Sequence, residues 1–100
     1  MELVGKILWS GELQTGKSQN GEWKRLEFVM EETDVRYPQR ALFKMRGTAA
    51  EDMAKVFEQS GTAGIWKAQF DIEARSFEKD NTERWVNDIN CWKLEKVERI

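Results

Sequence analysis

The chain has 100 residues, 40% hydrophobic and 34% charged, which is the size and composition of one globular domain spanning residues 1–100. It contains no histidine and one cysteine, Cys91, which excludes an internal disulfide and a multi-cysteine metal site and removes the commonest general base. Its apolar runs are too short for a membrane span, and its N-terminus lacks the pattern of a signal peptide. We therefore expect a cytoplasmic protein without cofactor or metal that binds another molecule and is not an enzyme.

Five segments alternate apolar and polar side chains, which is the period-two pattern of strands buried on one face. These segments are residues 2–13, 23–31, 37–46, 65–75 and 85–97. Gly5 and Gly11 interrupt the first segment, as glycines do where the strands of a small barrel bend. The alternation of the last segment is imperfect, which predicts a bulge in that strand.

Polar segments connect the predicted strands. Residues 14–22 are expected to form a loop with a tight turn at Asn20-Gly21, a pair that suits positive φ. Residues 78–84 are rich in charge and are expected to form the loop of the last hairpin.

One helix is predicted between the third and fourth strands. Thr48 and Glu51 have the spacing of a capping box, and Gly61 is a helix stop signal. The apolar face of this helix is expected to plug one end of the sheet with Met53, Val56 and Phe57.

Three strands, one helix and two strands, in this order, are the elements of the OB-fold. This all-β fold is a five-stranded Greek-key barrel, here with one short helix between strands 3 and 4. An SH3-like barrel is the alternative, but it has no natural place for such a helix. The phase of the alternation predicts a core that contains five aromatic residues: Phe28, Phe43, Phe57, Trp66 and Phe70.

Residues 11–18 match the phosphate-loop pattern G-x-x-x-x-G-K-[ST]. That loop binds phosphate because it opens a helix, whose free N–H groups point at the anion. Here Ser18 is followed by Gln-Asn-Gly, a turn that leads into a strand. We therefore interpret the match as part of a hairpin and not as a site of nucleotide hydrolysis.

Cations and aromatic side chains lie together on strand faces that the core does not use. Although the net charge is −2, residues 17–46 carry seven basic and five acidic residues. Trp23 shares a face with Arg25, and the next strand presents three more cations: Arg40, Lys44 and Arg46. Single-stranded nucleic acid needs this combination, because bases stack on rings and cations contact phosphates. The alternative is a solvated charged face, with Trp23 and Trp85 covering a barrel end or a subunit interface.

Ordered motifs occur along nearly the whole chain: Met1–Lys6, Gln14–Gly16, Glu22–Arg25, Glu27–Val29, Tyr37-Pro38, Asp71–Arg75, Arg84-Trp85 and Trp92–Lys96. Together they resemble a family of small bacterial proteins of unassigned function. The resemblance implies an OB-fold allied to single-stranded-DNA-binding proteins. In that class two strands and two loops line the groove. Carried over to this chain, the resemblance implies a site made of Lys17, Trp23, Arg25, Arg40, Lys44, Arg46, Phe77, Arg84 and Trp85.

Two functions are compatible with these observations. The first is binding of single-stranded DNA, or alternatively RNA, with little sequence preference. Trp23 and Trp85 would then stack on bases, and the strand cations would contact phosphates. The second is a protein-interaction or oligomerisation module, which would use the same face to dock a partner or a copy of itself. The acidic pI of about 5.3 favours the second function.

Overall fold

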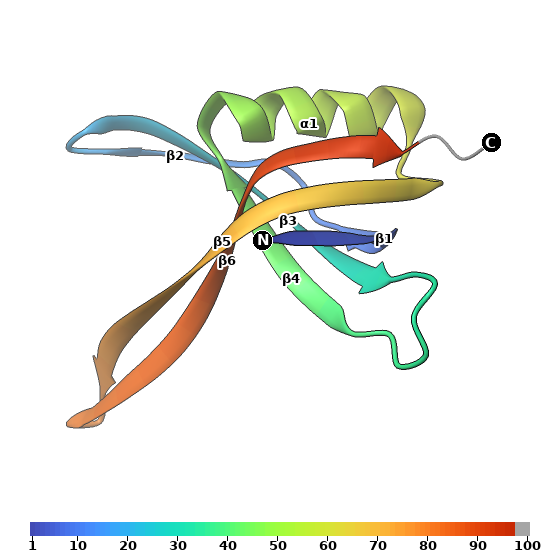
Figure 1. The fold of residues 1–100 in the computed structure, drawn as a ribbon. Helices are drawn as coiled ribbons and strands as arrows, with labels where there is room; N and C mark the ends of the chain where they lie inside the picture. Colours follow the sequence, from blue (N-terminus) through green and yellow to red (C-terminus); the bar gives the residue numbers. More distant parts are fainter. Residues whose placement is uncertain (98–100) are drawn as a thin grey trace.

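The computed structural model describes residues 1–97, and within them it contains six strands and one helix (Figure 1). In chain order the elements are β1 (Glu2–Ser10), β2 (Gln14–Ser18), β3 (Gly21–Glu32), β4 (Arg40–Arg46), α1 (Gly47–Ser60), β5 (Ile65–Lys79) and β6 (Thr82–Val97). None of the helical segments in this part of the chain has the length and apolar character needed to cross a membrane.

The strands form one closed sheet. Their order is β1-β5-β6-β4-β3-β2, and an additional pairing of β1 with β3 closes the sheet. All pairings are antiparallel except that of β4 with β6, in which Lys44 faces Asn90. With α1 following β4, this arrangement is the predicted OB-fold.

The first predicted strand is longer than expected and is broken in the middle. β1 pairs with the second half of β3 and β2 pairs with its first half, so β1 and β2 are two parts of one strand interrupted at residues 11–13. The prediction that residues 14–22 form a loop is therefore wrong except for residues 19–20, because β2 takes up residues 14–18 and β3 begins at Gly21. The predicted tight turn is present one residue earlier, at Gln19-Asn20, and Gly21, which follows it, has a φ of +112°.

The last hairpin is also longer than predicted. β5 and β6 pair as far as Lys79 and Thr82, so the loop predicted for residues 78–84 shrinks to the turn Asp80-Asn81. Both turn residues have positive φ, 53° and 63°, and this is the turn geometry that matches the twist of a two-stranded ribbon. The predicted bulge is confirmed as a register shift beside Phe70. Beyond it the two strands project from the sheet as an arm (Figure 1).

The core is aromatic and follows the predicted alternation. Phe28 and Phe43 are fully buried, and their rings stack with centroids 5.5 Å apart. Phe57 from α1 meets Phe28 edge-on at 6.2 Å and Trp66 at 5.6 Å, while Phe70 meets Phe43 at 5.1 Å. These edge-on contacts fix the helix against the sheet.

The helix differs from prediction in two details. It begins at Gly47, one residue early, so Thr48 lies inside the first turn and no side chain caps the helix. Glu51 pairs instead with the Lys24 ammonium of β3. Val56 is 39% exposed and does not plug the sheet. The helix ends as predicted, at Gly61, whose N–H donates to the carbonyl of Phe57.

Candidate functional site

The face of the sheet turned away from the core collects most of the predicted site residues. Residues paired directly across strands share a face, so the register of β1, β3 and β4 identifies the members of this outer face. It consists of Lys6, Trp9, Trp23, Arg25, Glu27, Val29, Glu31, Arg40, Leu42, Lys44 and Arg46. Five of these are cations and two are carboxylates, so this face is basic although the chain is acidic.

The indole ring of Trp23, a residue of β3, packs against the backbone of β2. Trp23 pairs with Gly16, and a Cβ at Gly16 would stand 2.7 Å from Trp23 Nε1 and closer still to two ring carbons. One face of the indole is therefore supported by β2, and the side chain remains 42% exposed. Gly16 belongs to the phosphate-loop match, and here its role is to make room for a ring.

Two arginines stand opposite each other beside this indole. Arg25 of β3 pairs directly with Arg46 of β4. The Arg25 guanidinium lies 5.8 Å from the Trp23 ring centroid, donates to Gln14 Oε1 and stands 3.4 Å from Glu27. Arg46 is exposed and makes no ion pair within residues 1–97. A hollow of about 420 Å³ is lined by Glu22, Trp23, Lys24, Arg25, Arg46 and Gly47.

Arg40 and Lys44 each form an ion pair with a carboxylate of the chain. Arg40 donates to Glu31 at 2.8 Å, and this hydrogen bond holds the pKa of Glu31 below its usual range. Lys44 donates to Asp88 Oδ1 at 2.8 Å, and only 16% of its side chain is exposed. Arg40 therefore remains accessible to a ligand, whereas Lys44 is largely enclosed.

Asp88 connects the arm to the rest of the sheet. It is the buried charged residue of the described chain, with 5% exposure, and it accepts hydrogen bonds from Lys44 of β4 and Arg75 of β5. These two bonds hold the pKa of Asp88 below its usual range. The register of β5 with β6 places Arg75 and Phe77 on the same side of the arm as Asp88.

The predicted arm residues divide between two faces. Phe77 pairs directly with Arg84, so both lie on the face that carries Asp88 and continues the outer face. Trp85 pairs with Ser76 and therefore lies on the opposite face of the arm, where it is 66% exposed. Lys17 is likewise separated from Trp23, because it pairs with Glu22 on the other face of the β2–β3 ribbon. The structure thus places seven of the nine predicted residues on one side of the sheet and arm.

Sequence reasoning missed Trp9. The β1–β3 register shifts between Ile7 and Trp9, so Leu8 is an extra residue and Trp9 turns to the outer face opposite Val29. The side chain is 53% exposed. The available signal was the run Ile7-Leu8-Trp9, in which three consecutive apolar residues break the alternation.

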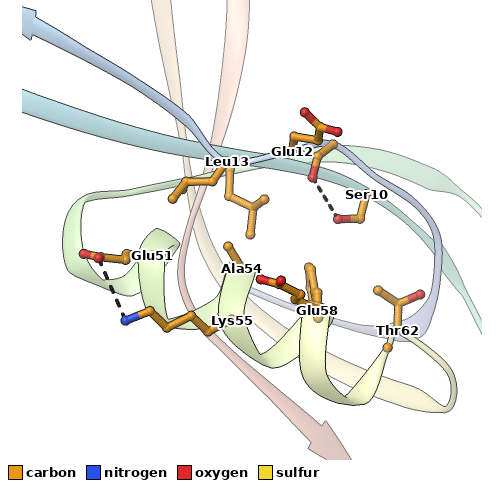
Figure 2. A pocket seen from close by; sticks show the side chains of 12 residues that line it. Ser10, Glu12, Leu13, Glu51, Ala54, Lys55, Glu58 and Thr62 are labelled. Carbon is orange, nitrogen blue, oxygen red and sulfur yellow. Dashed lines mark hydrogen bonds and ion pairs between the residues drawn. The ribbon is translucent and has the colours of Figure 1, made fainter.

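A larger hollow lies away from the outer face. Its volume is about 730 Å³, and it lies between the break at residues 11–13 and α1 (Figure 2). Figure 2 shows Glu12 on one wall and Glu51, Lys55 and Glu58 on the other. Three carboxylates against one ammonium make this hollow unsuited to phosphate.

The chain belongs to the family described as "Domain of unknown function (DUF3127)", whose model matches residues 2–95. None of the curated protein sequences compared with the chain matches it. The chain is similar in fold to the mitochondrial single-stranded DNA binding protein Rim1 of S. cerevisiae, with a TM-score of 0.65 and 13% identity over 98% of this chain and 93% of that one.

Two further solved structures share the fold. The single-stranded DNA binding protein from Thermus aquaticus matches with a TM-score of 0.68 and 15% identity, over 97% of this chain and 48% of that one. A Plasmodium falciparum SSB in complex with ssDNA matches with a TM-score of 0.55 and 11% identity, over 98% and 93% of the two chains. At these identities the matches establish the fold.

Proposed function

We propose that the chain binds single-stranded DNA, with little sequence preference, on the outer face formed by β3, β4 and the arm. The proposal rests first on Arg25 and Arg46. Like charges directly opposite each other destabilise a strand pair. Arg46 has no carboxylate partner within the described residues, so a phosphate between the two guanidiniums would offset their repulsion and gain two charge-assisted hydrogen bonds.

Trp23 supplies the ring for a base. Because β2 supports one face of the indole through Gly16, the ring is already oriented, and a base stacking on it would order few side chains. Every base has a flat face, so this contact does not select a sequence. The hollow beside Trp23 and Arg46 has room for the sugar and phosphate next to that base.

The arm would extend the same surface. Phe77 is 39% exposed and pairs with Arg84, so an aromatic ring and a cation lie together on the outer-face side of the arm. The Lys44–Asp88–Arg75 cluster fixes the root of the arm. Trp85 and Lys17, which lie on other faces, would contact DNA that passes around the edges of these ribbons.

The ion pairs on the outer face do not block this function. Arg40 and Arg25 pair with carboxylates near the surface, and such exposed pairs contribute little to stability. A phosphate can therefore replace the carboxylate at modest cost. The enclosed Lys44 would keep Asp88, so we assign the phosphate contacts to Arg25, Arg40, Arg46 and Arg84.

Titration with an oligothymidine of about 16 nucleotides, followed by tryptophan fluorescence, tests this proposal. Four phosphate contacts predict a salt slope of roughly −3, which is about a 60-fold loss of affinity between 50 and 200 mM salt. Arg46→Gln should weaken binding and reduce the slope by about 0.7. Lys55→Gln removes an exposed cation from α1 and should change neither.

The alternative is docking of a protein on the same face, which the carboxylate partners of Arg25, Arg40 and Lys44 favour. Absence of quenching at low salt, together with oligomers in light scattering, would support this alternative and reject DNA binding. Equal affinity at low and high salt would also reject phosphate contacts. Titration with oligouridine distinguishes RNA from DNA as the preferred strand.

A further inference from the structure

An apolar row crosses the outer face beyond the residues assigned above. Val29 of β3 pairs with Trp9 on one side and with Leu42 on the other, so the three side chains are neighbours on one face. Trp9 is 53% exposed and Leu42 is 45% exposed. The row exists because the extra residue Leu8 turns the indole outward.

A third hollow connects this row to Arg25. It has a volume of about 350 Å³ and is lined by Trp9, Gly11, Glu12, Leu13, Gln14 and Glu27. Two of these side chains also contact the Arg25 guanidinium: Gln14 accepts its hydrogen bond, and Glu27 is 3.4 Å away. Arg25 therefore stands between the hollow beside Trp23 and the hollow beside Trp9.

Charged rows border the apolar row on both sides. On one side Glu27 pairs with Lys44, and on the other Glu31 lies between Lys6 and Arg40. A protein interface needs about 800 Å² of complementary surface on each partner, which a row of three side chains does not provide. A single flat base with its phosphate at the charged border fits the row better.

We propose that Trp9 is a second base-stacking residue, so that a single strand of DNA crosses the outer face from Trp23, past Arg25, to Trp9. This inference rests on the proposed function. Trp23 and Val29 are six residues apart on β3, which separates the two rings by roughly 20 Å along the strand. A path of this length is compatible with the roughly 4–16 nucleotides that one OB-fold covers.

The test compares Trp9→Leu with Trp9→Phe in the oligothymidine titration. Both substitutions leave an apolar side chain at an exposed position, but only phenylalanine keeps a ring. We expect Trp9→Leu to weaken binding at least about 5-fold and Trp9→Phe to weaken it at most about 2-fold. Trp9→Phe should also remove part of the DNA-induced quenching, because one contacted indole is lost. Thermal unfolding confirms that each variant is folded.

Three results separate the possible failures. If Trp23→Leu weakens binding but Trp9→Leu does not, the DNA path past Trp9 is wrong and the proposed function stands. If Trp9→Phe retains the full fractional quenching, DNA does not contact Trp9, and the inference is overturned even if Trp9→Leu does not fold. If the wild-type chain does not bind the oligonucleotide at all, both proposals are rejected.

Discussion

At the scale of single residues, the site depends on a glycine, because the Trp23 indole occupies the space that a side chain at Gly16 would fill. Gly16 lies beneath Trp23, and a methyl group there would overlap the indole. Because the ribbon of β2 and β3 lies outside the core, the ring and not the backbone would have to move. The orientation of Trp23 is therefore set by a glycine on the neighbouring strand.

We predict that Gly16→Ala lowers affinity for oligothymidine and changes the fluorescence of the free protein while leaving the melting temperature nearly unchanged. The loss should be at most about that of one stacked base, or 1–3 kcal/mol. Thr15→Ala is the matched control, because this neighbour in β2 does not lie under Trp23. Equal affinities of wild type and Gly16→Ala would show that the placement of the indole is unimportant.

Other residue-scale features follow from burial alone. Cys91 is buried with 5% exposure, and its thiol donates to the Lys93 carbonyl. Burial raises the pKa of this thiol to about 11, so it remains protonated at neutral pH. Alternation predicted the burial of Phe28 and Phe43 equally well, because a strand with one solvated face has a fixed period of two.

At the scale of elements, the arm is the least predictable part of the fold. Fifteen residues of β5 pair with β6, but only the first part of β5 covers the core. The residue that fixes the arm, Asp88, lies 44 positions from its partner Lys44. A sequence pattern contains no signal for a contact of that range. Trp9 was missed for a local reason: one extra residue in β1 reverses the faces of those that follow.

We predict that the arm contributes acid-sensitive stability through Asp88. Its pKa is lowered in the folded state, so its stabilising effect is present above the ordinary aspartate value of about 3.9 and is lost as pH falls through the folded value. Asp88→Asn should therefore melt lower than wild type at pH 7. The difference should shrink below about pH 4.

Melting curves at pH 7 and pH 3 test this prediction. Asp71→Asn is the control, because Asp71 is an exposed carboxylate of the same arm and makes no ion pair within residues 1–97. It should melt like wild type at both pH values. A constant difference between Asp88→Asn and wild type across this range would mean that the ion cluster is not the source of the acid sensitivity.

At the scale of the whole molecule, the shape of the chain and the placement of its cations both favour the outer face as the binding surface. The radius of gyration is 15.1 Å, compared with about 13 Å for a compact domain of this length. The excess comes from the β2–β3 ribbon and the β5–β6 arm, which project from the closed sheet (Figure 1). Both carry an aromatic residue and a cation on the side that continues the outer face: Trp23 with Arg25, and Phe77 with Arg84.

The most direct test of this account is to map the surface that DNA contacts by comparing amide NMR spectra with and without oligothymidine. We expect the largest shift changes in β3, β4 and the tip of the arm, and at the indole N–H groups of Trp23 and Trp9. The helix α1 and the acidic hollow beside it should remain unchanged. Changes confined to α1, or no changes at low salt, would contradict the assignment of the outer face as a DNA-binding surface.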